Sequence, residues 1–245
     1  MNQTPRISVI VPMLNEAANV APLAEEIAAA CAPLAPFEAI FVNDGSTDAT
    51  AEEIARARAR HPWLRELRHA QSCGQSAALL SGVRAARAPV CVTLDGDGQN
   101  PPAEIPRLVA PLLADRDGRL GLVAGQRVAR RDSLSKRLGS RLANRVRARV
   151  LRDDTRDTGC GLKAFRRDLF LTLPYFDHMH RYLPALMRRE GYGVAHVDVA
   201  HRPRAAGRSH YSNLGRAMVG ALDLFGVWWL MRRRRLPRIA HEDRP

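Results

Sequence analysis

The sequence predicts an α/β fold in which helices flank a mostly parallel, open, Rossmann-like sheet. Short apolar runs alternate with helical stretches through the first half of the chain, which is typical of strand–helix–strand units. Three of these apolar runs end in Asn, Asp or Glu. A chain of 245 residues that is 46% hydrophobic is long enough for one large domain with a full core.

The first two strand–helix units each end their strand in polar residues. Asn15 and Glu16 follow the first apolar run, and Asp44 follows the second in a turn that also caps the next helix. In an open α/β sheet, ligands bind outside the carboxyl ends of the strands, so a polar rim there predicts a site. The expected bounds are strands 7–12 and 37–42 and helices 17–31 and 49–60.

The most informative segment is Asp95-Gly96-Asp97-Gly98-Gln99, directly after an apolar run at residues 90–94. Residues i and i+2 of a strand point the same way, so Asp95 and Asp97 are expected to face one spot where the strand ends. Carboxylate and amide oxygens are ligands for Mg²⁺ or Mn²⁺, with substrate phosphates completing the shell. We therefore select Asp97 and Gln99 as metal ligands, with Asp95 beside them or reaching a ribose.

The rest of the chain adds strands but no second metal motif. Residues 120–127 and 194–199 read as further strands. No apolar leader precedes the first strand, so no signal peptide is expected. The four cysteines and eight histidines show no metal-binding spacing, which favours reduced thiols in the cytosol.

Charge is unevenly distributed. Residues 1–118 hold 10 arginines against 14 acidic residues, whereas residues 119–245 hold 28 basic residues against 11 acidic ones, and the whole chain carries +13. Such asymmetry indicates a polyanionic partner, either nucleic acid or an anionic membrane, and it also suits substrates that carry phosphate.

Two segments favour the membrane. In residues 133–151, leucine and valine recur every fourth residue with arginines beside them, as in a helix lying in a membrane interface or, alternatively, on the domain's own core. The apolar stretch at residues 220–231 is too short and interrupted to span a bilayer. Its paired tryptophans, followed by the arginines at 232–235, suit an interfacial anchor.

Five ordered motifs carry a family resemblance: residues 11–16, 42–48, 95–102, 157–165 and 201–211. They resemble family 2 glycosyltransferases of the GT-A fold, in the polyprenyl-phosphate sugar transferase branch. The resemblance covers about residues 6–230. It implies a GT-A domain over residues 1–211, with a nucleotide half to about residue 118 and an acceptor half after it. A basic amphipathic membrane-surface segment would then follow at residues 212–245.

The resemblance implies an inverting, metal-dependent transfer of a sugar. The donor would be a nucleoside-diphosphate sugar, the acceptor an undecaprenyl or dolichyl phosphate, and the metal Mg²⁺ or Mn²⁺. The enzyme would act peripherally on the inner, cytoplasmic face of the cell membrane, with a possible membrane partner subunit and no nucleic acid.

The expected site residues fall into four groups. Arg127 and Arg208 are the favoured acceptor-phosphate residues, and Ser209 is expected to donate a hydrogen bond there. Ser72 stands where the family usually has Asn. The nucleotide-sugar set is Pro12, Asn15, Glu16, Asp44, Gly74 and Asp95; the metal set is Asp95, Asp97 and Gln99; the acceptor-phosphate set is Arg127, Arg131, Lys136, Arg204, Arg208 and Ser209; the catalytic set is Asp97, Asp157 and Arg127.

Two other functions stay open. A GT-A transferase acting on a saccharide or protein hydroxyl would need a true general base, which is the role that Asp157 would take. Asp157 could instead be a helix cap or a partner for Arg156. A non-catalytic, basic nucleotide- or nucleic-acid-binding module would bind DNA or RNA in a salt-sensitive way. Acidic residues at three strand ends argue against that module, since they repel a phosphate backbone.

Overall fold

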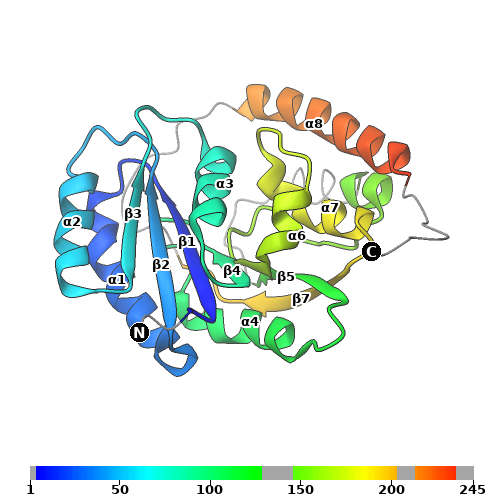
Figure 1. Cartoon of the computed structure of the whole chain (residues 1–245). Coiled ribbons are helices and arrows are strands. Elements are labelled where there is room, and N and C mark those ends of the chain that lie inside the picture. The colour runs from blue at the N-terminus through cyan, green and yellow to red at the C-terminus, as the bar shows by residue number, and fades with distance from the viewer. Residues whose placement is uncertain (1–3, 129–145, 203–212, 236–245) are drawn as a thin grey trace, which may run out of the picture.

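The computed structural model describes residues 4–128, 146–202 and 213–235. In this part of the chain a seven-stranded sheet runs through the molecule, with helices on both faces (Figure 1). The strands are β1 Ile7–Met13, β2 Phe37–Asn43, β3 Leu64–Arg68, β4 Val90–Thr93, β5 Leu120–Arg127, β6 Lys163–Arg166 and β7 Gly193–Val199.

The strand order is β3-β2-β1-β4-β6-β5-β7. The β1–β2, β2–β3, β1–β4 and β5–β7 pairs are parallel, and only β6 runs antiparallel to its neighbours β4 and β5. The predicted mostly parallel sheet is therefore confirmed. Because β2, β1 and β4 are adjacent and parallel, the three polar strand ends meet at one edge of the sheet.

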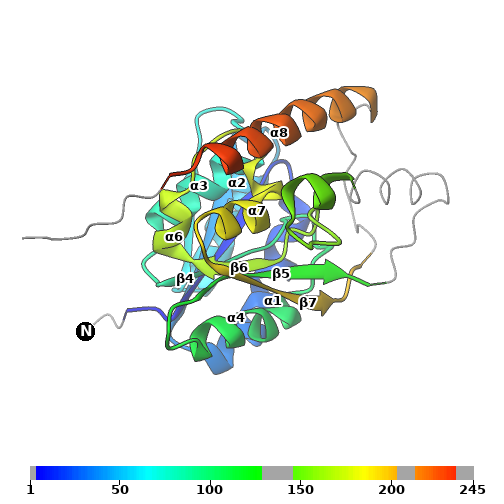
Figure 2. The same ribbon diagram turned by 90° about the vertical axis from the view of Figure 1, so that its right-hand side faces the viewer.

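Helices cover the two faces of the sheet in separate layers (Figures 1 and 2). One apolar core lies between the sheet and α1, α2 and α4, and the other lies between the sheet and α3, α6, α7 and α8. The bounds are α1 Ala17–Cys31, α2 Thr50–Arg60, α3 Gln75–Ala85, α4 Ile105–Ala114, α6 Arg167–Thr172, α7 Leu183–Arg189 and α8 Asn213–Arg233, with short 3-10 turns η1 Ala32–Leu34, η2 Pro102–Glu104 and η3 Met179–Arg181.

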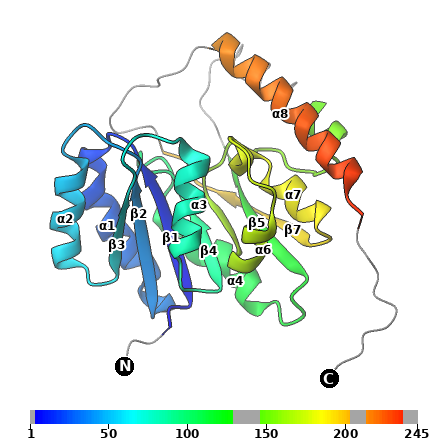
Figure 3. The same ribbon diagram turned by 45° about the horizontal axis from the view of Figure 1, so that its top comes forward.

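The long helix α8 lies across the outside of the second layer (Figure 3). Val227 is buried against the second core, and Leu224, Trp228 and Met231 pack on it from the same side. The opposite side is exposed and apolar, with Leu222 68% and Phe225 64% accessible. Among the described residues, no helix is both long and apolar enough to cross a bilayer.

Only the end of the predicted amphipathic segment 133–151 lies in the described residues, where 146–151 are helical. Val146 and Val150 point outward, with 48% and 38% of their surface exposed. Arg147 is instead buried and paired with Asp153. In this described end, the valine stripe therefore does not pack on the domain's own core.

Candidate active site at the carboxyl edge of the sheet

The acidic segment after β4 lies directly against the end of β1. A Cβ on Gly96 would come within 2.7 Å of the Pro12 carbonyl oxygen, so only glycine allows this approach. The contact fixes the backbone between Asp95 and Asp97 beside the end of β1. Pro12 thus shapes the site through its backbone.

Asp95 is held by two amide side chains. Gln75, the first residue of α3, donates to one carboxylate oxygen at 2.7 Å, and Asn100 donates to the other at 2.9 Å. Gly161 leaves the space that this carboxylate fills. Burial, and then the negative charge of Asp97, raise the pKa of Asp95, although Lys163, Asn100 and Arg127 act against them.

Asp97 and Gln99 form a compact turn. Asp97 is only 7% exposed, and its carboxylate accepts a hydrogen bond from the Gln99 backbone N–H at 3.1 Å. The Gln99 side-chain amide donates to the Arg202 carbonyl at 3.4 Å, and the Arg202 N–H donates back to the Gln99 carbonyl at 3.0 Å. Asp95 and Asp97 thus place two carboxylates of like charge together, an arrangement that a divalent cation stabilises.

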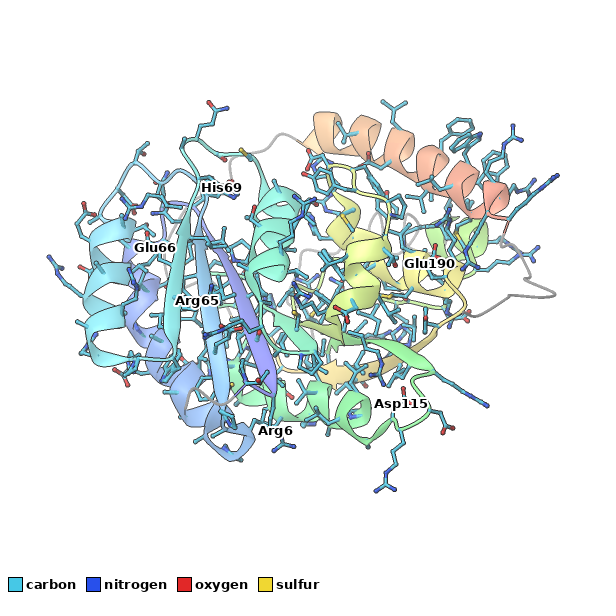
Figure 4. The ribbon with its side chains drawn as sticks, viewed as in Figure 1. Arg6, Arg65, Glu66, His69, Asp115 and Glu190 are labelled. Atoms are coloured by element: carbon cyan, nitrogen blue, oxygen red, sulfur yellow. The ribbon has the colours of Figure 1, made fainter. Side chains whose placement is uncertain are left out.

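Asp44 organises the loop before α3. Its carboxylate accepts hydrogen bonds from the Ser72 hydroxyl and from the backbone N–H groups of Cys73 and Gly74, all at 2.9 Å. His69, the residue after β3 (labelled in Figure 4), has its Nδ1 atom 2.7 Å from the same carboxylate. Burial acts to raise the pKa of Asp44, but these hydrogen bonds outweigh it and hold the pKa below its ordinary value.

The hydroxyl of Ser72 therefore has a defined partner where the family usually has an asparagine amide. Asp44, His69 and Cys73 also bring three possible metal-ligand atoms together. The carboxylate already accepts four hydrogen bonds, and His69 Nε2 lies 2.9 Å from the Ser81 hydroxyl. These contacts describe a hydrogen-bonded support for the loop rather than a metal centre.

Asn15 and Glu16 tie the ends of β1 and β2 together. Asn15 takes a positive φ of 56°, and its side-chain oxygen accepts from the Thr47 N–H at 2.8 Å. Its own N–H donates to the Ser46 hydroxyl at 3.0 Å. The Glu16 N–H donates to the Thr50 hydroxyl at 2.9 Å. Both residues thus shape the rim of the site, and their contact with a nucleotide stays a prediction.

Arg127, at the end of β5, donates two parallel hydrogen bonds to Asp157. Its Nε and Nη2 atoms donate to the two carboxylate oxygens at 2.6 and 2.8 Å, and both side chains are nearly buried. Burial acts to lower the pKa of Arg127, but Asp157 outweighs it and raises the pKa. The predicted alternative that Asp157 pairs with Arg156 is wrong, because the Arg156 guanidinium bonds to Gln126 and Asp198 instead.

Lys163 is a buried cation that sequence reasoning missed. It is 3% exposed, and its ammonium donates to the carbonyls of Thr158 and Cys160, in the loop after Asp157. Burial lowers the pKa of Lys163, while the nearby Cys160, Asp95 and Asp157 act to raise it. The sequence signal that could have identified it is a single lysine in the glycine-rich motif at residues 157–165. Asn100 lies inside the 95–102 motif and Gln75 lies outside the five motifs, but nothing in their spacing indicated that both bind Asp95.

The remaining predicted acceptor residues lie outside the described residues: Arg131, Lys136, Arg204, Arg208 and Ser209. Of the predicted set, the structure brings Pro12, Asp95, Asp97 and Gln99 together at the end of β4 and pairs Arg127 with Asp157 nearby. Asp44 and Gly74 lie in the adjoining loop.

Comparison with known proteins decides the family. The model of "Glycosyl transferase family 2" matches residues 8–173. A dodecaprenyl-phosphate galacturonate synthase of Rhizobium johnstonii is 33% identical over 96% of this chain and 70% of its own length. The chain belongs to glycosyl transferase family 2.

Other relatives agree. An undecaprenyl-phosphate 4-deoxy-4-formamido-L-arabinose transferase of Pectobacterium carotovorum is 34% identical over 85% of this chain, which spans 63% of that relative. Glucosyl-3-phosphoglycerate synthase of Mycobacterium tuberculosis, solved with Mn²⁺, UDP and glucosyl-3-phosphoglycerate, superposes with a TM-score of 0.70 at 20% identity, over 93% of this chain and 80% of its own. The predicted GT-A fold is confirmed by this likeness and by the sheet order.

Proposed function

We propose that this protein transfers a sugar from a nucleoside-diphosphate sugar to a polyprenyl phosphate at the inner face of the cell membrane. The observation that carries the proposal is the placement of Asp95 and Asp97 where three adjacent strands end, beside the loop that Asp44 organises. The names of the family relatives support a polyprenyl-phosphate acceptor.

The donor set fits a divalent metal. Asp95 and Asp97 supply hard oxygen ligands, and the raised pKa of Asp95 reflects buried negative charge that a cation would offset. We assign Asp95, Asp97 and Gln99 to Mg²⁺ or Mn²⁺; a structural neighbour was solved with Mn²⁺ and another structure of that enzyme with Mg²⁺. When bound, the metal would offset the charge that develops on the leaving diphosphate.

We infer that the acceptor is an anionic phosphate. A phosphate oxygen is already charged near neutral pH, so the nucleophile needs no strong base. Arg127 donates a hydrogen bond to each carboxylate oxygen of Asp157, which fixes the direction of this side chain and engages both of its oxygens. This pairing favours a positioning role for Asp157 over proton abstraction, and it supports a phosphate acceptor over a hydroxyl.

Helix α8 supplies a surface for lipid. Its outer stripe, Val219, Leu222, Phe225 and Trp229, is exposed over 40–68% of each residue. Arg232 and Arg233 lie over the rings of Trp228 and Trp229, 4.5 and 5.8 Å from the ring centres. Apolar side chains beside exposed arginines match an anionic bilayer surface. We therefore propose that α8 lies in the membrane interface.

The decisive experiment is a transfer assay. The full chain is incubated with undecaprenyl phosphate, Mg²⁺ or Mn²⁺ and a panel of radiolabelled UDP- and GDP-sugars, and lipid is then extracted. We expect one donor to label the lipid and Asp97→Ala to abolish the labelling. Asp168→Ala, which changes an exposed aspartate on α6, is the matched control and retains activity.

Other outcomes separate the alternatives. Label entering a saccharide or protein, and none entering lipid, would leave the fold standing and overturn the acceptor. Salt-sensitive binding to DNA or RNA, with no turnover and no effect of Asp97→Ala, would favour the non-catalytic module. Turnover that appears only after membrane extract is added would support a partner subunit.

A further inference from the structure

We propose that the connection between α6 and α7 couples the docking of α8 on lipid to the geometry of the donor site, with His178 and His180 as positioning residues. The inference rests on the proposed function, because it takes Asp95 as part of the donor site and α8 as the lipid-facing helix. In Figure 1 this connection lies between α3 and α8.

One end of the connection is tied to α8. His178 Nδ1 lies 3.2 Å from a carboxylate oxygen of Asp223, whose side chain is 19% exposed. Four residues on, the Tyr182 hydroxyl donates to the Gly220 carbonyl at 3.3 Å. Asp223 and Gly220 are one turn apart on α8, so the connection is attached to this helix at two neighbouring points.

The other end is tied to the donor site. His180 Nδ1 lies 2.8 Å from the hydroxyl of Ser76, which is buried in the first turn of α3. The preceding residue, Gln75, donates to Asp95 at 2.7 Å. Gly74, the cap of α3, donates to Asp44 at 2.9 Å. The first turn of α3 thus holds carboxylates that follow two different strands.

The segment between these ends is short and well supported. Only Met179 separates the two histidines, and it is 1% exposed in the second core. The Arg181 N–H donates to the His178 carbonyl at 3.0 Å, and the Tyr182 N–H donates to the Met179 carbonyl at 2.8 Å. His178 has a positive φ of 63°, a conformation that surrounding contacts must maintain.

Because His178 and His180 belong to one packed turn, a displacement of one would shift the other in this proposal. Binding of α8 to lipid would hold Asp223 and, through His178 and His180, the first turn of α3. Gln75 would then keep Asp95 in place. The enzyme away from a membrane would hold its donor site less firmly.

Hydrogen–deuterium exchange tests the coupling without needing a sugar donor. The full chain is measured with and without vesicles of phosphatidylcholine and phosphatidylglycerol. We expect vesicles to slow exchange in residues 219–233 and also, by about threefold, in residues 75–80. Asp223→Leu, which removes the partner of His178, should keep the protection of residues 219–233 and lose the protection of residues 75–80.

Two matched variants sharpen the test. Glu190→Gln alters a carboxylate that pairs with Arg234, the residue after α8. It lies off the proposed route, so this variant should retain both effects. His180→Leu should lose the protection of α3, whereas His180→Asn, whose side chain can still bond to Ser76, should retain it.

The outcomes distinguish this inference from the proposed function. Vesicle protection of α8 without any change in residues 75–80 would overturn the coupling and leave membrane docking intact. Retention of the protection of residues 75–80 in Asp223→Leu would overturn the route through His178. Absence of protection in α8 would overturn membrane docking and the coupling with it, while the transfer assay would still decide the catalytic proposal.

Discussion

At the scale of single residues, the site depends on glycine as much as on carboxylates. Gly161 faces the Asp95 carboxylate so closely that a Cβ would overlap it. We expect Gly161→Ala to displace Asp95 and reduce transfer by about 100-fold, because an error of about 1 Å in a reacting geometry has that effect. Activity and Mn²⁺ binding by electron paramagnetic resonance measure the change. Gly226→Ala, where a Cβ meets nothing, should leave both unchanged.

A second residue-scale prediction concerns a buried carboxylate away from the site. Glu38 is 1% exposed and accepts hydrogen bonds from Ser8, Arg65 and Arg87. Burial acts to raise the pKa of Glu38, but the hydrogen bonds outweigh it and keep the pKa below its ordinary value. Its charge therefore stabilises the fold above the unfolded pKa of about 4.3, and this stabilisation is lost as the pH falls through the lower folded pKa.

Glu38→Gln should therefore lower the free energy of unfolding by about 1–3 kcal/mol at pH 7. Below pH 4, the free energies of unfolding of Glu38→Gln and of the unchanged protein should differ by less. Urea denaturation at the two pH values tests both statements. Glu53→Gln, which alters a partly exposed carboxylate paired with Arg56, is the control. An equal loss at both pH values would show that the contribution of Glu38 is not its charge.

Sequence reasoning located the polar strand ends but not their mutual contacts. Asp95 and Asp97 were identifiable because they follow an apolar run, a local signal. The fork between Arg127 and Asp157 joins residues 30 positions apart, so local pattern gave no means of choosing Arg127 over Arg156 as the partner. Lys163 was missed for the same reason, since its burial depends on the loop that folds over it.

At the scale of elements, the local hydrophobic pattern was sufficient to predict the bounds of strongly apolar strands and helices. Helix Ala17–Cys31 and strand Leu120–Arg127 have the predicted bounds. The edge strand Leu64–Arg68 was not predicted, because its sequence is mostly charged and its pairing comes from β2. The antiparallel β6 was missed because four residues carry too little periodicity.

Helix α8 allows a prediction that separates its two faces. Replacing Leu222 and Phe225 by serine should weaken binding to anionic vesicles by about tenfold or more, because both side chains leave water only at the membrane. The free energy of unfolding should hardly change. Val227→Ala, on the inner face, should instead lower the free energy of unfolding by about 2 kcal/mol. Vesicle sedimentation and urea denaturation measure the two effects. Loss of stability in the outer-face variant would show that this face packs on protein.

At the scale of the whole molecule, positive charge is concentrated in the second half of the chain, where α8 ends. Of the terminal arginines, 232, 233 and 235 are exposed, whereas Arg234 is paired with Glu190. This leaves a compact cationic edge beside an apolar stripe. A surface that binds nucleic acid needs positive charge but no exposed apolar stripe. The presence of both beside each other on α8 therefore favours lipid as the partner.

The exposed arginines and the apolar stripe of α8 should contribute to membrane binding with different dependence on salt. Raising NaCl from 0.1 to 0.5 M shortens the Debye length from about 10 Å to less than half of that, so binding to anionic vesicles should weaken while the apolar stripe retains a residual affinity. Changing arginines 232, 233 and 235 to glutamine should remove most of the salt dependence. The control is the same change at arginines 56, 58 and 60, which are exposed on α2 and should have no effect. If both triple variants weaken binding equally, net charge rather than the cationic edge of α8 governs attachment. If high salt abolishes binding completely, the apolar stripe makes no contact with lipid.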